Sequence, residues 1–367
     1  MHIVHTEADG GKGGQPLRII NESLGMIQRG HQVTILCPDT APLHPLAKSA
    51  GLNVVTMPLK RKNVGNLLTL RRWINDNRDS IDVINSHNSA DTWLVALVNL
   101  FSSRPVPLVR TRHASGVPRN NWTTRWLYRK ACKHIVSTGE ALRLQMVALG
   151  VPLGNTTSVP SGVDTSRFHP GDKEAARNHC DLSQEDFWLG VVSHLRPNKG
   201  HSVLLKALAQ INISEIKVAI VGDGPHREAL EREVIQQNLL TRVVLAGHRA
   251  DPERWFPAFD IAISPSHDME GVPQGVLQSL ATGIATIATD AGGTADAIID
   301  RKTGLLIGQQ DVDALRDAIV TLYHDTLLRR QLAEQGNEYL NAHFTRDCML
   351  TAMEKVFNDA AQLNSSR

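Results

Sequence analysis

Short apolar runs alternate with longer amphipathic stretches along most of the chain. Runs of this kind are typical of buried strands, and the amphipathic stretches are typical of helices. In the first half a helix is predicted over 15–28, closed by Gly30. The apolar runs of this half predict strands at 3–5, 32–36, 53–57, 82–86, 107–111, 133–137 and 156–159. Such alternation predicts a doubly wound parallel sheet.

The second half repeats the pattern after a turn-rich stretch over 160–171, which is the predicted linker. Helices are expected to fill 312–362, and strands are predicted at 187–192, 217–221, 243–245, 261–263, 285–288 and 305–307. A chain of 367 residues is longer than one hydrophobic core usually spans. The sequence therefore predicts an α/β protein with two Rossmann-like doubly wound domains, over 1–165 and 166–346, facing each other across a cleft.

The main candidate for chemistry is the stretch 270–281, which follows a strand-like run and opens an amphipathic helix. Glu270 would stand at the carboxyl edge of a parallel sheet, where open α/β folds bind ligands. Gly271 and Gly275 leave the N–H groups of the first helical turn open to an anion such as a diphosphate. Gln278, about two turns further on, can face the same ligand. An acidic helix start followed by an ordinary surface glutamine is the alternative interpretation. The apolar face of this helix would carry Val276, Leu277, Leu280 and Ala281.

Four other loops are candidates for ligand contact. The loop 10–14 could cradle a phosphate or admit an acceptor, although it has neither the dinucleotide spacing nor a Walker lysine. The loop 222–225 follows a strand and is either a ligand loop or a tight turn. The segment 196–200 brings two cations to a helix start, which can neutralise a leaving diphosphate without a metal. His113 ends the fifth strand, where it serves either the site or the structure.

Composition indicates a globular protein, with 41% hydrophobic and 21% charged residues. No apolar run approaches the roughly 18 residues of a membrane helix, and Met1 leads directly into a strand, so no signal peptide is expected. The four cysteines are scattered without metal or disulfide spacing, which fits a cytoplasmic location.

The charge is uneven along the chain. Residues 1–165 hold 19 Lys and Arg against 10 Asp and Glu, while the whole chain has a net charge of +2. The basic residues of this half include 60–62, 71–72, Arg110, Arg112, Arg119 and the helix-like segment 125–133. Such a half suits an anionic membrane surface or acceptor, and simple solvated faces are the alternative. Nucleic acid is not expected as a partner, because no nucleic-acid-binding motif accompanies the charge.

Taken in order, these motifs resemble the retaining GT-B glycosyltransferases of family four, which use nucleotide-sugar donors. The resemblance covers nearly the whole chain and rests on the order and spacing of the motifs together. They are Gly13–Gly14, 29–35, Thr111 with His113, 161–164, 195–200, 222–225, 270–281 and Gly292–Gly293.

The resemblance implies roles for matching positions. Two catalytic residues are expected: His113, which would contact the donor sugar, and Glu270, which would hold the transferred sugar. Lys199 would grip the diphosphate, and a final helix over 347–367 would cross back onto the N-terminal domain. The other expected donor-binding residues are Gly13, Gly14, His194, Arg196, Gly247, Arg249, Gly271, Val272, Pro273, Gln274, Gly275, Val276 and Gln278.

The sequence departs from the family pattern at two places. The family pairs Glu270 with a second glutamate eight residues on, which accepts hydrogen bonds from the ribose hydroxyls, and here that residue is Gln278. An amide still accepts through its oxygen but loses the charge-assisted strength. The family arginine five residues before Lys199 is His194 here, while Arg196 stands two places later. Either His194 or Arg196 would then serve the phosphates.

The resemblance implies transfer of a sugar, from a UDP-sugar in the first instance, to a saccharide or lipid-linked acceptor. The expected setting is lipopolysaccharide or other cell-surface polysaccharide synthesis, in the cytoplasm or at the inner face of the plasma membrane. No cofactor is expected, and no metal, because Asp311 and Asp313 form a D-x-D pattern that helix capping explains better. The alternatives are a sugar-nucleotide epimerase of the same fold, a non-catalytic binding subunit and, weakest, a nicotinamide oxidoreductase.

Overall fold

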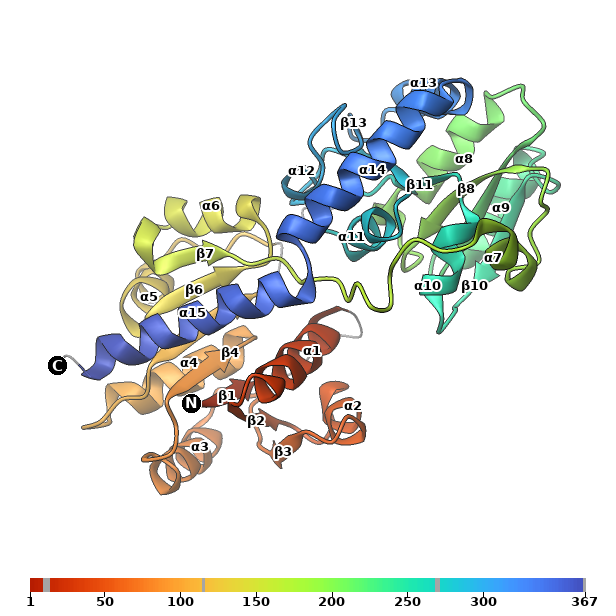
Figure 1. The fold of residues 1–367 in the computed structure, drawn as a ribbon. Helices are drawn as coiled ribbons and strands as arrows, with labels where there is room; N and C mark the ends of the chain where they lie inside the picture. Colours follow the sequence, from red (N-terminus) through yellow and green to blue (C-terminus); the bar gives the residue numbers. More distant parts are fainter. Residues whose placement is uncertain (9–13, 114–115, 268–270, 366–367) are drawn as a thin grey trace. The chain divides into compact units, whose positions relative to one another are not determined.

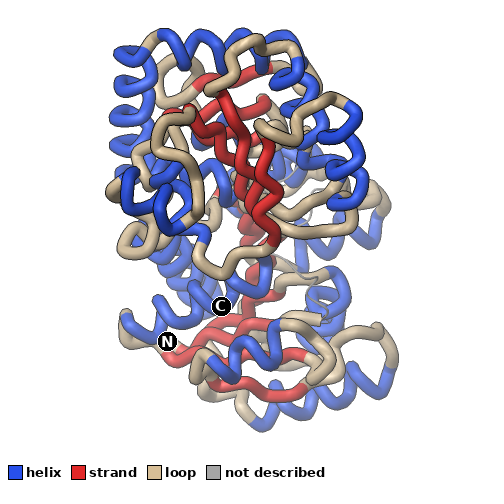
Figure 2. Tube along the Cα trace, turned by 90° about the vertical axis from the view of Figure 1, so that its right-hand side faces the viewer, coloured by secondary structure: helices blue, strands red, loops and turns tan. Residues whose placement is uncertain are grey.

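The computed structural model describes residues 1–8, 14–113, 116–267 and 271–365. The chain divides into two compact units, Met1–Ser161 with Asp347–Arg367 as unit 1, and Gly162–Arg346 as unit 2. It therefore passes from one unit to the other twice. In each unit the strands form a central layer with helices on both faces (Figure 2).

Unit 1 contains a parallel sheet of seven strands in the order β3-β2-β1-β4-β5-β6-β7. The strand order reverses between β1 and β4, so the loops that follow these two strands diverge at that point of the edge. In register, His5 of β1 lies beside Asn85 of β4, which lies beside Val109 of β5. The strands are β1 His2–Thr6, β2 Gln32–Cys37, β3 Asn53–Thr56, β4 Val83–Ser86, β5 Leu108–Arg112, β6 His134–Ser137 and β7 Thr156–Ser158.

Unit 2 repeats the arrangement with six parallel strands in the order β10-β9-β8-β11-β12-β13. Its order reverses between β8 and β11, which places the loops after these strands at its switch point. The strands are β8 Phe187–Val192, β9 Ile216–Val221, β10 Val243–Gly247, β11 Ile261–Ser264, β12 Ala285–Thr289 and β13 Leu305–Ile307.

The thirteen strands among the described residues lie where the apolar runs predict them, and their ends differ from the prediction by no more than two residues. The predicted fold class, an α/β protein of two Rossmann-like units, is confirmed. The sequence places the divisions after residues 165 and 346, and the structure divides after Ser161 and Arg346. The helix-like segment 125–133 is the end of a short α-helix, α5 Trp122–Trp126, followed by a π-helical turn over Leu127–Ala131.

The helices of unit 1 begin with α1 Gly14–Gln28, whose end is marked by Gly30 at φ +85°. Besides α5, the other described helices of this unit are α2 Leu43–Ser49, α3 Val64–Asp76, α4 Ser89–Leu100, α6 Glu140–Ala148 and α15 Arg346–Ser365. The helices of unit 2 are α7 Lys173–His179, α8 His201–Ala209, α9 Arg227–Gln236, α10 Pro252–Trp255, α11 Gln274–Ala281, α12 Thr294–Ala297, α13 Val312–His324 and α14 Thr326–His343.

The last helix of the chain, α15, packs on unit 1 beside α1 (Figure 1). Met353 and Phe357 are fully buried there, against apolar residues of the strands such as Ile3 and Val83. At the rim, Arg29 donates to Glu354 at 2.8 Å, and His31 bonds the same carboxylate at 2.9 Å. One face of the unit 1 sheet is therefore covered by a segment from the far end of the chain. No helix in the described part of the protein combines the length and the apolar character needed to cross a membrane.

Candidate active site

His113 directly follows β5 at the carboxyl edge of the unit 1 sheet, and its side chain is half-buried. It is the last of three imidazoles in a row. Its Nε2 lies 3.0 Å from Nδ1 of His87, and Nε2 of His87 lies 2.9 Å from Nδ1 of His5. Their strands β5, β4 and β1 are neighbours in the sheet, so the parallel pairing brings the three rings together.

The loop that carries His87 is held by a buried carboxylate. Asp91, in the first turn of α4, accepts hydrogen bonds from the backbone N–H of His87 at 3.0 Å and of Asn88 at 2.9 Å. It also accepts from the hydroxyl of Thr6 at 2.9 Å. Burial raises the pKa of Asp91 to about 6, while the nearby Arg110 and these hydrogen bonds oppose the rise. This capping carboxylate fixes the turn between β4 and α4.

Glu7 is a second carboxylate at this edge, buried and one residue beyond β1. The side-chain amides of Gln15 and Asn88 both donate to it, so it links the start of α1 to the loop after β4. Because an amide donates to each of its oxygens, the carboxyl group of Glu7 is held in a fixed position in the wall of the site.

The pKa of His113 lies well below the ordinary histidine value, because burial disfavours its charged form and the cations Arg18 and Arg110 repel it. The pKa of His87 is lowered for the same reasons. His113 therefore stands at this edge as a neutral imidazole, which can accept a hydrogen bond at one nitrogen and donate from the other.

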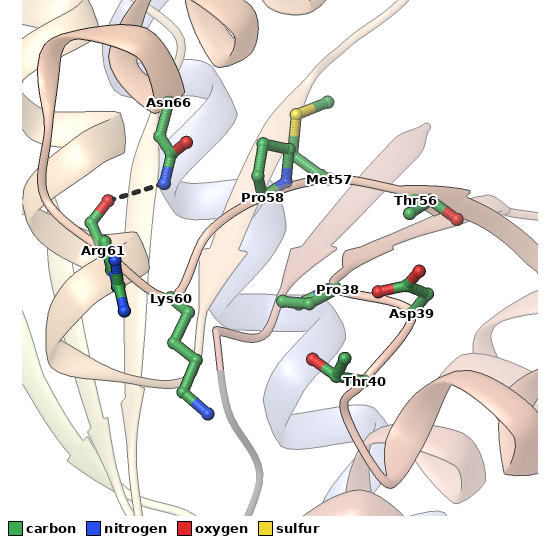
Figure 3. Close-up of a pocket in the computed structure, with 9 residues that line it drawn as sticks. All are labelled: Pro38, Asp39, Thr40, Thr56, Met57, Pro58, Lys60, Arg61 and Asn66. Carbon is green, nitrogen blue, oxygen red and sulfur yellow. Dashed lines mark hydrogen bonds between the residues drawn. The ribbon is translucent and has the colours of Figure 1, made fainter.

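Unit 1 also has a pocket of about 310 Å³ beyond the ends of β2 and β3 (Figure 3). Asp39, Lys60 and Arg61 supply its charged groups. The amide of Asn66 donates to the carbonyl oxygen of Arg61 at 2.9 Å and holds one rim in place. The full lining is Pro38, Asp39, Thr40, Thr56, Met57, Pro58, Lys60, Arg61 and Asn66. No motif in the sequence predicts this pocket, because its lining residues come from separate segments that share no pattern.

In unit 2 the loop after β8, residues 193–200, is clamped by backbone. The N–H of Leu195 donates to the carbonyl of Asp223 at 3.0 Å, and the N–H of His267 donates to that of Asn198 at 3.0 Å. Gly222 has φ +145°, and a Cβ there would overlap the carbonyl oxygen of Ser193. Gly200 has φ +72°, and a Cβ there would overlap the carbonyl oxygen of Pro265. Glycine is required at both positions, because strand ends β9 and β11 approach the loop at backbone distance.

This loop lines a pocket of about 200 Å³ beyond the ends of β8, β9 and β10. His194 is exposed at its wall, and Arg249 lines the opposite end with its guanidinium 5.3 Å from the ring centre of Trp255. The lining residues are Val192, Ser193, His194, Val221, Gly222, Asp223, His248, Arg249 and Pro252. The structure thus brings His194 and Arg249, two predicted donor-binding residues, to one pocket, with Gly247 at the end of β10 beside them.

Arg196 precedes the short 3₁₀ turn Pro197–Lys199 in the same loop and is exposed, and Lys199 ends this turn and is half-buried. Neither belongs to the lining of that pocket, so their cations lie on the part of the loop that continues toward α8.

Helix α11 carries the predicted apolar face: Val276, Leu277 and Leu280 are fully buried and Ala281 is 2% exposed. Gly271, Val272 and Pro273 lead into the helix, and Gln274 and Gly275 form its first turn. Gln278 is half-buried in the following turn. The first-turn N–H groups of a helix have no partner within it and carry the positive end of the helix dipole. This start belongs to the same carboxyl edge of unit 2 as the loop after β8.

Two of the predicted site residues, Gly13 and Glu270, lie outside the described residues. Asp311 accepts from the N–H of Ala314 at 2.9 Å, so its predicted capping role is confirmed, and Asp313 pairs with Arg316 at 2.8 Å. Among the described residues, no three His, Cys, Asp or Glu side chains are grouped so that they could hold a metal ion.

Sequence reasoning missed most of the polar network in unit 1. His5, His87, Glu7 and Asp91 were not singled out, although His87 and Glu7 each follow a predicted strand, the same signal that identified His113. The prediction that Arg110 and Arg112 contribute to a basic surface was wrong. Both are only 4% exposed, because they lie on β5, an inner strand of the unit 1 sheet.

The fold and this edge geometry define a protein of two Rossmann-like doubly wound units. A family model described as "Glycosyl transferases group 1" matches residues 172–339, and one described as "Glycosyltransferase Family 4" matches residues 12–167. The chain belongs to the group 1 glycosyltransferases.

Known proteins agree with this assignment. The chain is 25% identical over 358 residues to a D-inositol 3-phosphate glycosyltransferase of Nocardia farcinica, which covers 86% of this chain and 78% of that protein. It is 24% identical over 279 residues to a lipopolysaccharide core biosynthesis mannosyltransferase of Rhizobium leguminosarum bv. viciae, covering 74% and 76% of the two chains. The crystal structure of Anabaena Alr3699/HepE in complex with UDP superposes with a TM-score of 0.87 at 19% identity, covering 98% of this chain and all of that one. The protein is therefore a glycosyltransferase with the GT-B fold.

Proposed function

We propose that this glycosyltransferase moves a sugar from a nucleoside-diphosphate donor, a UDP-sugar in the first instance, to a hydroxyl group of a saccharide or lipid-linked acceptor, with retention at the anomeric carbon. The observation that carries the proposal is that the loops after β8, β9 and β10 line one pocket. The loop after β8 also carries two cations, Arg196 and Lys199. The UDP held by the Anabaena neighbour supports this class of donor.

Charge separation explains how the residues would act. As the bond from sugar to diphosphate breaks, positive charge develops on the sugar and negative charge on the diphosphate. Lys199, Arg196 and the start of α11 oppose the negative charge, which makes a metal ion unnecessary. Glu270 opposes the positive charge, and the leaving phosphate takes the proton of the acceptor hydroxyl.

The acceptor side of the proposal belongs to unit 1. Its pocket combines the cations of Lys60 and Arg61 with the carboxylate of Asp39 and with hydroxyl and carbonyl groups, which suits a polar saccharide. The lipopolysaccharide mannosyltransferase among the relatives supports an acceptor of cell-surface polysaccharide synthesis.

A donor screen tests the function directly. Purified protein is incubated with UDP-, GDP- and ADP-sugars, with and without a saccharide acceptor, and release of nucleoside diphosphate is measured. We expect one nucleotide sugar to be turned over, with activity that survives exhaustive chelation by EDTA. An isomerised donor in the absence of acceptor would indicate an epimerase instead, and donor binding without turnover would indicate a binding subunit.

Lys199→Ala should lower kcat/KM by about 10–100-fold, the loss expected for a charge-assisted hydrogen bond. The matched control is Lys206→Ala, an exposed lysine on α8 in the same unit, which should leave the rate unchanged. The anomeric configuration of the product, determined by NMR, tests retention.

Location at the inner face of the plasma membrane is part of the proposal. On α3, Val64 and Leu68 are 70% and 56% exposed, and Arg71 and Arg72 are exposed one to two turns further on. The exposed Lys60, Arg61 and Lys62 precede this helix. Apolar side chains flanked by cations suit an anionic lipid surface.

The protein should then bind anionic vesicles better than neutral ones at low salt, and added salt should weaken that binding. The double variant Arg71→Gln, Arg72→Gln should reduce it, whereas Arg301→Gln with Arg330→Gln, exposed arginines of unit 2, should not. Equal binding to both kinds of vesicle would remove the membrane from the proposal.

A further inference from the structure

The three imidazoles at the unit 1 edge form a continuous hydrogen-bonded row from the interior to the site. His5 is fully buried, His87 is 1% exposed and His113 is half-buried, so the row has an inner end and an outer end. The Nδ1 to Nε2 distances of 2.9 and 3.0 Å are those of ordinary hydrogen bonds. Each of the two bonds needs one nitrogen with a proton and one with a lone pair.

All three rings are neutral at ordinary pH. Burial lowers the pKa of His5 to about 3, and the pKa values of His87 and His113 lie well below the usual one. A neutral imidazole has one N–H and one bare nitrogen. The middle ring, His87, therefore donates to one neighbour and accepts from the other, and both bonds must run in the same direction. Only two arrangements of protons satisfy the row.

The inner end distinguishes these arrangements. Nε2 of His5 lies 4.0 Å from Oε1 of Glu22 on α1, and both side chains are fully buried. That nitrogen has no hydrogen-bond partner within the described residues. Nε of Arg18 lies 3.5 Å from the other oxygen of Glu22, so the buried carboxylate is the counter-ion of a buried guanidinium. A proton on Nε2 of His5 points a positive N–H dipole at this carboxylate, whereas a lone pair there would be repelled by it.

We propose that Glu22 acts as a positioning residue that sets the tautomer of His113 through His5 and His87. With the proton of His5 on Nε2, its Nδ1 accepts from Nε2–H of His87. Nδ1 of His87 then accepts from Nε2–H of His113. The outermost nitrogen, Nδ1 of His113, is left with its lone pair, and the site offers a hydrogen-bond acceptor to a hydroxyl group of the bound sugar.

The rest of the row's surroundings fit this arrangement. Arg110, 4% exposed on β5, and Arg18 both repel a proton that would make His87 or His113 cationic. Phe357 of α15 meets the ring of His5 edge-on, with ring centres 6.4 Å apart, and helps to fix its orientation. The amide of Asn85 lies 3.4 Å from Oε1 of Glu22 and is in turn bonded to Thr111 at 2.9 Å. The carboxylate is thus held in place independently of the histidines.

The first test is made on the unmodified protein without any ligand. Long-range ¹H–¹⁵N correlation spectra of protein labelled with ¹⁵N-histidine distinguish bare from protonated ring nitrogens, with signals assigned by single substitutions. We expect Nδ1 of His113 to be bare and its Nε2 protonated, with Nε2 of His5 also protonated. A protonated Nδ1 on His113, alone or in an imidazolium, would overturn the inference.

The second test removes the groups at the inner end of the row that would fix the tautomer of His113. Glu22→Gln removes the charge, and His5→Phe removes the inner acceptor while keeping the ring shape; either should make the His113 signals those of mixed tautomers. His134→Phe is the control, because His134 lies on the adjacent strand β6 and bonds Thr157 at 2.8 Å outside the row. Unchanged His113 signals in a folded Glu22→Gln or His5→Phe protein would contradict the role of the inner end.

The kinetic consequence rests on the proposed function. In Glu22→Gln and His5→Phe, kcat for sugar transfer should fall about tenfold with the donor KM within a few fold, the effect of one hydrogen bond in the transition state. The two proposals can fail separately. A bare Nδ1 on His113 without transfer to any acceptor contradicts the proposed function alone, and full transfer activity in variants with scrambled tautomers contradicts the role of the tautomer in catalysis.

Discussion

The two units share a doubly wound topology, but different groups form the hydrogen bonds at the carboxyl edges of their sheets. At the unit 1 edge most of the hydrogen bonds are made by side chains: the three imidazoles bond one another, Glu7 accepts from the amide of Asn88, and Asp91 accepts from the backbone N–H of His87. At the unit 2 edge the loops are held by backbone hydrogen bonds, and glycines allow the close approach of their backbones. The polar side chains His194, Arg196 and Arg249 are exposed there.

Because of this difference, the two edges suit different kinds of ligand. Buried, mutually bonded side chains are held in a low dielectric with fixed protonation, so unit 1 suits recognition of particular hydroxyl groups. Backbone N–H groups and exposed cationic side chains suit a diphosphate, because its recognition requires many hydrogen-bond donors and little shape complementarity. A change at one edge can therefore be measured with the other edge as an internal reference.

Acidification should separate the two units most strongly. In unit 1 the histidines of the row have lowered pKa values, so below about pH 6.5 they bind protons in the unfolded chain but not in the folded protein. Their contribution to stability is therefore complete above about pH 6.5. It is lost as the pH falls toward about 3, the pKa of His5. Asp91 and Glu22 have raised pKa values and bind protons in the folded state, which offsets part of this loss. We expect the free energy of unfolding of unit 1 to fall by about 1–3 kcal/mol per pH unit just below pH 6.5.

In unit 2, burial lowers the pKa of His201 to about 4, which gives a smaller dependence of the same sign. Urea unfolding at a series of pH values, followed by pulsed hydrogen exchange and mass spectrometry, reports each unit by its own peptides. Equal loss in both units would show that the buried imidazoles do not distinguish the two edges.

Removing the proposed sugar carboxylate should have the next largest effect. Glu270→Ala should lower turnover by about 10²–10³-fold, the scale for loss of a group that stabilises transition-state charge. Nucleoside-diphosphate affinity, measured by calorimetry, should stay within a few fold, because the proposed partner of Glu270 is the sugar. Glu228→Ala, whose side chain is 87% exposed on α9, is the control. Near-normal turnover in the Glu270 variant would remove this residue from the mechanism.

A methyl group should damage the backbone-built edge. In Gly222→Ala the Cβ meets the carbonyl oxygen of Ser193 at a φ that alanine rarely adopts. We expect unit 2 to lose about 1–3 kcal/mol of stability and the protein to bind nucleoside diphosphate more weakly. Gly308→Ala is the matched control, since its nearest contact, with Asp311, is 3.5 Å away. Tolerance of Gly222→Ala would show that the loop after β8 can move without loss of the pocket.

The smallest effect is expected at Gln278, a half-buried side chain of α11 proposed to meet the ribose of the nucleotide. Gln278→Ala should weaken nucleoside-diphosphate binding by about 1–2 kcal/mol, the scale of a hydrogen bond whose partner is left unpaired. Gln278→Glu should preserve or improve binding if the ribose lies there, and should weaken it if the diphosphate lies close instead. Unchanged affinity in both variants would make Gln278 a surface residue.

The sequence predicted the strands well because each is a short apolar run between polar turns, a local signal. It predicted the apolar face of α11 for the same reason. The network around His113 could not be predicted, since it depends on β1, β4 and β5 being neighbours, and that order is set by tertiary packing. Arg18 and Glu22 look like the solvated face of an amphipathic helix, yet both are buried and paired. Arg110 and Arg112 mislead in the same way, because charge counted along a chain carries no information about which side chains reach water.

The position of α15 has a consequence for how the protein is made. On a ribosome, residues 1–161 emerge first, but the sheet face formed by Ile3, Val33, Val83, Val109 and Val136 is covered by Met349, Met353 and Phe357 from the end of the chain. Unit 2 is a continuous segment and can complete its core while synthesis proceeds. Unit 1 keeps this apolar face uncovered until α15 has been synthesised, so the unit whose synthesis begins first is completed after unit 2 and is the one more in need of a chaperone.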